Sequence, residues 1–202
     1  MKIISIIPLK KGYSTIMDEN QNTFVLSDKI IKKEQIAIGE IDDNKFFDIY
    51  NKARKKEVVS ALLKKLKYKS FSEKQLITYL KEKGYNDKEI EYGINLLKDK
   101  RIINDERLIE NTISYYKENH LFSRYFISQK LILAMGKDQI DKINEKMNRI
   151  YPAEEEVEII YKILKKKKIK NKDRALIFIR SKGFPYSAFV EAYNRFISEI
   201  EN

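Results

Sequence analysis

The fold is decided by residues 58–84, which read VVSALLKKLKYKSFSEKQLITYLKEKG. Val58, Leu62 and Leu66 recur at every fourth position, so their side chains share one face of an α-helix. A lysine-rich turn follows this helix, and the apolar residues beyond it again have helical spacing. The stretch therefore predicts two helices joined by a basic turn.

Helix starts and stops can be read on either side of that turn. Ser72 followed by Gln75 is a capping box, and Asn86 followed by Glu89 starts a further helix in the same way. Gly84 lies between these two starts, where it ends the preceding helix because glycine readily adopts the left-handed conformation. The sequence therefore predicts a unit of three helices.

The same order of helices returns twice further along the chain. The stop glycines Gly84, Gly136 and Gly183 lie 52 and 47 residues apart. A period of this size predicts stacked three-helix repeats that form an elongated, curved domain. Such a stack offers an extended binding surface rather than a deep pocket. The predicted repeats are residues 51–103, 104–152 and 153–202.

Residues 1–50 have a different pattern and form a predicted β-rich extension. Segments 2–7, 13–17 and 23–26 are apolar and rich in β-branched residues, and the Asp and Asn residues of segment 18–22 suit a hairpin turn. A short helical turn follows, and segment 36–39 is a further expected strand. The chain is therefore predicted to be mainly α, with a small β-rich N-terminal extension.

Composition limits the chemistry of the chain. Its 202 residues include no cysteine and a single histidine, so thiolate metal sites and cysteine nucleophiles are excluded. The formal net charge is +11, and residues 51–103 alone carry 15 basic and 7 acidic groups. An anionic partner is expected. Because neither a signal peptide nor a membrane-spanning run is recognisable, we expect a cytoplasmic protein that has no membrane partner.

No catalytic or cofactor-binding motif is present in the sequence. His120 lies in a polar segment and is expected to be a solvated residue at a helix end. The acidic run 154–156 resembles a metal cluster, yet it falls in the first turn of a predicted helix, where carboxylates suit the helix dipole. We therefore expect no enzyme activity, no cofactor and no metal.

Two lysine clusters remain as candidate binding residues. The first surrounds Tyr68 and Phe71, and the second is a run of four consecutive lysines. Each cluster also has an explanation that involves no binding, because lysines at a helix C-terminus are often simply solvated. The two clusters occupy the same place in the first and third repeats, which predicts that they share one edge of the stack. They comprise Lys64, Lys65, Lys67 and Lys69, and Lys165, Lys166, Lys167 and Lys168.

Three segments carry a resemblance to a known family. Segment 61–84 has an apolar helix, a basic turn, a Ser-Glu helix start and a leucine-bearing helix that ends in Lys-Gly. Segment 102–108 is an apolar pair that leads to Asp105-Glu106, and segment 180–184 reads RSKGF. These features resemble the RecX family, whose members modulate the RecA recombinase, and the β-rich start resembles its Firmicute-type members. Segment 126–137 departs from the family pattern, so the chain is identified as a divergent member.

The resemblance implies a regulator rather than an enzyme. RecX proteins lie in the helical groove of the RecA–single-stranded-DNA filament, where they suppress ATP hydrolysis and strand exchange. They thereby affect homologous recombination, DNA repair and the SOS response. The implied partners are the RecA filament and, through phosphate contacts, single- or double-stranded DNA. We expect the two lysine clusters to supply most of the attachment; Arg54, Lys74 and Lys81 are weaker candidates.

Two alternatives stay open at this point. One is a sequence-independent nucleic-acid-binding protein that has no RecA partner; the scarcity of arginine favours phosphate contacts over base readout. The other is a structural helical adaptor whose lysines are merely solvated. A monomer is the expected state of such a repeat stack.

Overall fold

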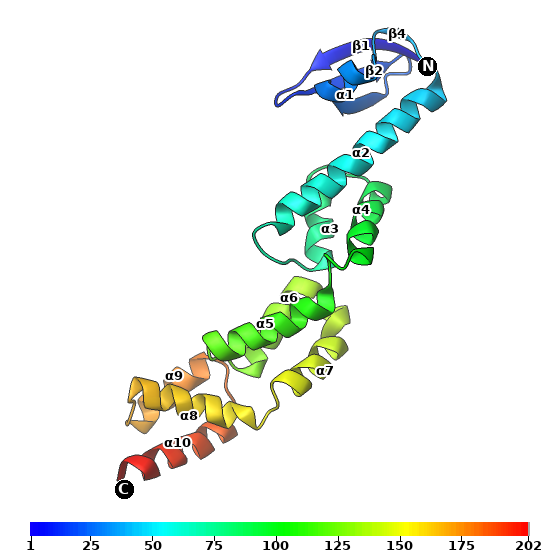
Figure 1. The fold of residues 1–202 in the computed structure, drawn as a ribbon. Helices are drawn as coiled ribbons and strands as arrows, with labels where there is room; N and C mark the ends of the chain where they lie inside the picture. Colours follow the sequence, from blue (N-terminus) through cyan, green and yellow to red (C-terminus); the bar gives the residue numbers. More distant parts are fainter. Residues whose placement is uncertain (202) are drawn as a thin grey trace. The chain divides into compact units, whose positions relative to one another are not determined.

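The computed structural model describes residues 1–201 and is mainly helical, with a small antiparallel sheet at the N-terminal end (Figure 1). This confirms the predicted fold class, which is mainly α with a small β-rich N-terminal extension. The chain divides into two compact units. The first contains residues 1–68 and 80–97, and the second contains residues 69–79 and 98–202. None of the helices in residues 1–201 has the length and apolar character needed to cross a membrane.

The N-terminal sheet has the strand order β3-β2-β1-β4, and its neighbouring strands are antiparallel. The three predicted strands before the helical turn are confirmed. The fourth is shorter than expected, because Ile36 turns into the hydrophobic core and only Gly39–Glu40 pairs with β1. The strands are β1 (Lys2–Pro8), β2 (Tyr13–Asp18), β3 (Thr23–Ser27) and β4 (Gly39–Glu40).

Helices α1 (Asp28–Lys33) and α2 (Asp43–Leu66) belong to the same unit as the sheet. Phe46 at the start of α2 is fully buried in one hydrophobic cluster with residues of the sheet. The Asp42 side chain caps the helix by accepting a hydrogen bond from the Lys45 backbone N–H at 2.8 Å. The predicted boundary between residues 50 and 51 therefore falls inside one continuous helix. The start of this helix is fixed by the Asp42 cap and by the burial of Phe46.

The second half of α2 packs against α4 (Asp87–Asp99). Gly93 makes this close approach possible, since a Cβ atom there would lie 3.1 Å from side-chain atoms of Val58 and Leu62. The predicted capping box at the start of α4 is confirmed: Asn86 N donates to Glu89 Oε2 at 2.9 Å, and Glu89 N donates to Asn86 Oδ1 at 3.0 Å. Helix α3 (Glu73–Glu82) precedes α4.

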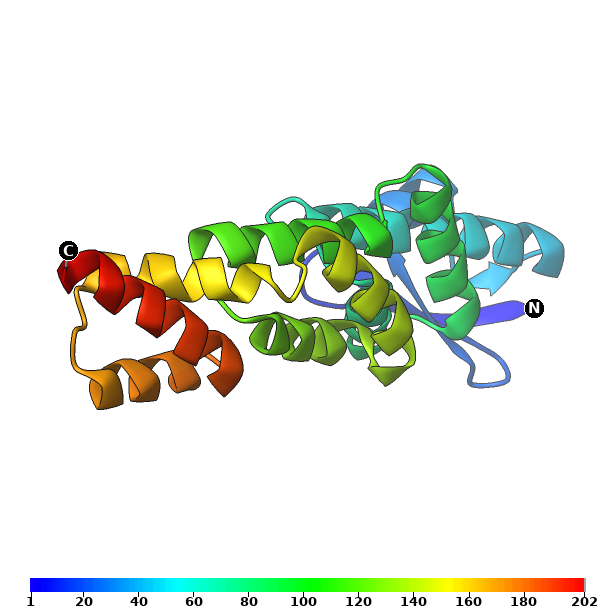
Figure 2. The same ribbon diagram turned by 90° about the horizontal axis from the view of Figure 1, so that it is seen from below.

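The second unit is built around one hydrophobic core that contains Ile109, Leu131, Ile160 and Phe189. Within it, α8 (Glu155–Lys167) and α10 (Tyr186–Glu201) pack against each other (Figure 2). The remaining elements are α5 (Asp105–Asn119), α6 (Arg124–Met135), the 3₁₀ turn η1 (Lys137–Gln139), α7 (Ile140–Ile150) and α9 (Lys172–Ser181).

Consecutive repeats are joined by carboxylates that cap helices. Asp105, in the first turn of α5, accepts a hydrogen bond from the Glu73 backbone N–H at 2.9 Å, and Glu156 of α8 accepts one from Arg124 N–H at 2.9 Å. Burial raises the pKa of both carboxyl groups. Glu155 and Glu156 lie in the first turn of α8, as the sequence predicts, and Glu156 in addition caps α6 through this bond. The acidic residues that open a repeat thus cap the second helix of the repeat before.

Candidate functional site

The first lysine cluster lies at the C-terminal end of α2. Lys64 and Lys65 are in its last turn, and Lys67 follows as the C-cap residue. Positive charge is favourable here because the helix dipole leaves partial negative charge at this end. Lys64 and Lys67 are exposed and Lys65 is half-buried. The predicted placement of these lysines at a helix end is therefore confirmed.

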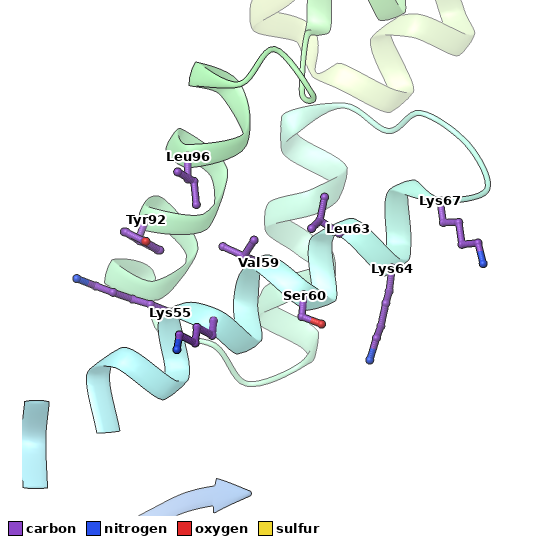
Figure 3. Close-up of a pocket in the computed structure, with 9 residues that line it drawn as sticks. Lys55, Val59, Ser60, Leu63, Lys64, Lys67, Tyr92 and Leu96 are labelled. Carbon is purple, nitrogen blue, oxygen red and sulfur yellow. The ribbon is translucent and has the colours of Figure 1, made fainter. Parts of the chain in front are cut away.

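A groove runs between α2 and α4 beside this cluster, with a volume of about 690 Å³ (Figure 3). Val59 and Leu63 of α2 and Tyr92 and Leu96 of α4 face the space between the helices. Leu63 is 45% exposed and Tyr92 is 38% exposed, so the groove presents apolar surface to solvent.

Lysines surround this apolar surface. None of the residues that line the groove is acidic. The Lys55 ammonium lies 4.8 Å from the centre of the Tyr92 ring, within the range of a cation–π contact. The groove can therefore hold apolar side chains while its edge attracts carboxylates or phosphates. The lysines are Lys55, Lys56, Lys64 and Lys67.

Sequence reasoning missed Lys55, Lys56 and Tyr92. The signal was present in part, because Lys56, Ser60 and Lys64 recur at every fourth residue along α2 and so share one face. The contribution of α4 was not readable in this way. It depends on Gly93, which brings the two helices together and so places Tyr92 beside the α2 surface.

Arg54 lies inside the first unit rather than on a binding surface. Its side chain is 15% exposed and forms two hydrogen bonds with the Glu89 carboxylate, at 2.7 and 3.0 Å. The guanidinium also lies 4.6 Å from the centre of the Tyr85 ring and 3.4 Å from Glu57 Oε2. Arg54 thus connects α2 to the start of α4 and helps to hold together the two helices that form the groove.

Glu57 is the carboxylate of this network with fewer hydrogen bonds. Burial raises the pKa of its carboxyl group, despite the opposing effect of the Arg54 charge. Its Oε1 atom is buried and accepts no hydrogen bond within residues 1–201. A buried carboxylate oxygen without a donor costs free energy, so we expect Glu57 to stabilise the first unit less than Glu89 does.

The other candidate lysines near the first repeat are dispersed. Lys69 belongs to the second unit, where its ammonium lies 4.7 Å from the centre of the Phe71 ring. Lys74 is exposed on α3. Lys81 forms an exposed ion pair of 3.4 Å with Asp87. These residues do not line the groove between α2 and α4.

The second lysine cluster ends α8, as expected. Lys165 pairs with Glu199 at 2.7 Å and lies 5.6 Å from the Tyr161 ring centre. Lys168 ends the helix in the left-handed conformation, with φ 54°. The three lysines after Lys165 are exposed and form no ion pair in the described part of the chain. Because Lys64, Lys65 and Lys67 belong to the first unit and lysines 165–168 to the second, a shared edge stays a prediction.

The middle repeat lacks such a cluster. Lys117, in the last turn of α5, is 17% exposed, donates to the Ile150 carbonyl at 2.9 Å and pairs with Glu155 at 2.5 Å. Its charge is therefore used within the protein. His120 caps the end of α5 and is exposed, as the sequence predicted. No group of three or more metal-ligating side chains is found among residues 1–201.

Helical repeats that carry a lysine-edged groove define a class of binding proteins, and comparison with known proteins narrows it. No family model matches the chain. The regulatory protein RecX of Caldanaerobacter subterraneus subsp. tengcongensis is 29% identical over 158 residues, which cover 77% of this chain and 78% of that relative. RecX of Bacillus velezensis is 27% identical over 197 residues, covering 94% of this chain and 73% of that relative.

Solved structures agree with these sequence relatives. A crystal structure of a regulatory protein RecX covers 96% of this chain and 98% of its own, with a TM-score of 0.60 and 20% identity. That of RecX from Lactobacillus salivarius covers 71% of this chain and 96% of its own, with a TM-score of 0.62 and 18% identity. The resemblance expected from the sequence is confirmed: over most of its length the chain is similar to RecX regulatory proteins, and the solved structures share its fold.

Proposed function

We propose that this protein is a negative regulator of the RecA recombinase. In this proposal it binds, as a monomer, in the groove of the RecA–single-stranded-DNA filament and inhibits ATP hydrolysis and strand exchange. It thereby limits homologous recombination during DNA repair and the SOS response. The proposal is supported by the resemblance to RecX proteins, which spans most of the chain.

The observation that carries this proposal is the groove between α2 and α4. Its apolar floor and lysine edge suit a protein surface that combines apolar side chains with carboxylates, because burial of the former and attraction of the latter act together. Bare DNA offers phosphates but no aliphatic side chains to fill the space around Val59 and Leu63. The groove therefore favours RecA itself over DNA as the group that binds here.

The lysine clusters have different parts in this proposal. Lys64 and Lys67 act at the groove, where apolar contacts add to the charge. The lysines at the end of α8 attach to phosphates or acidic side chains of the filament through charge alone. We assign Arg54 a structural part, since its guanidinium is already bonded to Glu89.

The proposal is tested by measuring DNA-dependent ATP hydrolysis by RecA while the protein is titrated from substoichiometric to stoichiometric amounts. Single-stranded DNA is kept in excess, so that competition for DNA cannot cause the result. Loss of hydrolysis is expected. Unchanged hydrolysis with the cognate recombinase would contradict the proposal and reduce the resemblance to one of fold.

A single variant tests the groove. Leu63→Glu places a carboxylate among the lysines and removes an apolar contact, and because Leu63 is 45% exposed the fold should persist. Inhibition is expected to weaken by about tenfold or more, as for an interface hot spot. Ile177→Glu is the matched control, because Ile177 is 71% exposed on α9 and lies outside the groove. Equal inhibition by the two variants would contradict this use of the groove.

The alternative is a sequence-independent nucleic-acid-binding protein without a RecA partner. Lysines 166–168 are exposed and pair with no carboxylate in the described residues, so they are available to bind phosphates, which favours this alternative. The two functions are separated by comparing affinity for bare single-stranded DNA with affinity for the RecA-coated strand, at equal salt. Tighter binding to the coated strand supports the RecA role, and equal or weaker binding supports the alternative.

A further inference from the structure

A cluster of aromatic rings lies at the C-terminal end of α5, within the second unit. Leu121 adopts a left-handed conformation, with φ 52°, and reverses the chain after the helix. Phe122 N–H then donates to the Tyr116 carbonyl at 3.2 Å, and the two rings stack with centres 5.5 Å apart and planes 8° apart. The cluster, which we call the aromatic patch, comprises Tyr115, Tyr116, His120, Phe122 and Phe126.

The rings of the aromatic patch form a continuous series. The His120 ring centre lies 5.0 Å from that of Tyr115, 5.2 Å from that of Tyr116 and 5.5 Å from that of Phe122. Phe126 extends the series, 5.3 Å from Phe122. Tyr115 is 52% exposed, Phe126 is 38% exposed and His120 is also exposed. Much of this ring surface therefore remains in contact with solvent.

Lysines lie over two rings of the patch. The Lys130 ammonium is 5.1 Å from the Tyr116 ring centre, and the Lys182 ammonium is 5.1 Å from the Phe122 ring centre. Neither lysine forms an ion pair with a carboxylate in the part of the chain that is described. Lys130 and Tyr116 also line a groove of about 310 Å³ together with Lys69 and Thr112. Positive charge thus accompanies the exposed rings.

This combination has a specific chemistry. Exposed rings stack on planar bases, and lysines beside them neutralise the phosphates that connect those bases. A duplex cannot use such a surface in the same way, because its bases are already stacked on one another. An aliphatic protein segment would fill apolar space but would leave the lysines without anionic partners. We infer that the aromatic patch binds single-stranded nucleic acid by stacking on its bases, with Lys130 and Lys182 on the backbone.

The test uses the full-length protein without RecA and compares two fluorescein-labelled probes by anisotropy. One is a 20-nucleotide oligothymidylate, and the other is an abasic strand of the same length, which keeps the phosphates and lacks the bases. The expected result is that the wild-type protein binds the oligothymidylate at least about tenfold more tightly. Equal affinity for the two probes would overturn the inference, because it would show that the phosphates alone are bound.

A double variant locates the stacking. Tyr115→Ala with His120→Ala removes two exposed rings and is expected to weaken oligothymidylate binding by about tenfold, with abasic binding unchanged. Tyr115→Phe with His120→Phe keeps two rings and is expected to retain the affinity. Tyr186→Ala is the control, since Tyr186 is 58% exposed on α10 outside the patch.

Each other outcome would overturn the inference. If the double alanine variant binds oligothymidylate like wild type, or loses both probes equally, base stacking at this patch is wrong. If it binds oligothymidylate normally yet no longer inhibits RecA, the patch is a protein-binding surface. The proposed regulation of RecA stands or falls separately, because the assays with the oligothymidylate and abasic probes contain no recombinase and inhibition of RecA is measured on its own.

Discussion

The first and third helical repeats share the same order of helices, with a lysine-rich end on the first helix and a glycine after the second, yet their surroundings differ. In the first repeat, the lysines at the end of α2 border an apolar groove. In the third, Lys165 pairs with Glu199 and the three lysines after it are exposed to solvent. A lysine run therefore indicates charge, and its apolar neighbours decide whether it also forms a shaped site.

The largest expected contrast is in stability, between substitution of a buried and of an exposed basic residue of the first repeat. Arg54→Ala leaves the Glu89 and Glu57 carboxylates without their guanidinium partner, so the free energy of unfolding should fall by about 3 kcal/mol. Lys64→Ala, on the exposed face of the same helix, should change it by less than about 0.5 kcal/mol. Urea unfolding at pH 7 measures both. Equal stability of the two variants would show that the Arg54 network does not hold the repeat together.

The stop glycines offer a second contrast between the repeats. Gly84 and Gly183 have φ values of 79° and 80°, but a Cβ atom at Gly84 would meet open space, whereas one at Gly183 would lie 2.7 Å from Ser123 Oγ. Gly84→Ala should cost about 1 kcal/mol, for the left-handed backbone alone. Gly183→Ala should cost about 2 kcal/mol or more, because overpacking is added. Thermal unfolding of both variants measures this, and equal costs would contradict the close contact at Ser123.

The two lysine clusters should differ in their effect on the RecA filament. Reversal of Lys64, Lys65 and Lys67 to Glu is expected to lower filament affinity by about tenfold or more, because charge repulsion then acts at the groove. The matched reversal of Lys166, Lys167 and Lys168 should lower affinity less and act mainly through the salt dependence. Co-sedimentation with the filament at several salt concentrations measures both effects. A larger loss of filament affinity from reversal of Lys166, Lys167 and Lys168 would contradict this prediction.

The smallest expected effect concerns pH. Because burial raises the pKa of Glu57 above that of the unfolded chain, the folded state holds this proton more tightly. The contribution of the Glu57 carboxyl group to the free energy of unfolding is fully present below the ordinary glutamate pKa of about 4.3. This contribution is lost as the pH rises through the raised pKa of the folded state. Glu57→Gln should therefore be at least as stable as wild type at pH 7, with the difference shrinking toward pH 4. A variant less stable at pH 7 would show that the bond to Arg54 outweighs burial.

Much of the fold could be predicted from local sequence signals. The capping boxes at Ser72 and Asn86 and the stop glycines act within a few residues, so they are readable without tertiary information. The boundary between residues 50 and 51 was placed less well, because it falls inside α2. Burial of Phe46 against the sheet joins the predicted extension to the first repeat through this one helix.

The candidate site was less predictable, since it depends on which side chains meet. A sequence shows that Arg54 is basic but not that it faces Glu89, which lies 35 residues away. It likewise shows lysines along α2 but not the apolar surface that α4 adds beside them. Exposed rings such as Tyr115 and His120 have no distinctive spacing, and only the reversal at Leu121 brings them together with Phe122.

The central claim is that the groove between α2 and α4 contacts RecA. A photo-crosslinking amino acid, p-benzoylphenylalanine, replaces Leu63 in one protein and Ile177 in another, and each is irradiated with RecA assembled on single-stranded DNA. We predict that the probe at position 63 forms a covalent adduct with RecA and that the probe at position 177 does not. An adduct with DNA alone at position 63, or equal RecA adducts at both positions, would contradict the claim.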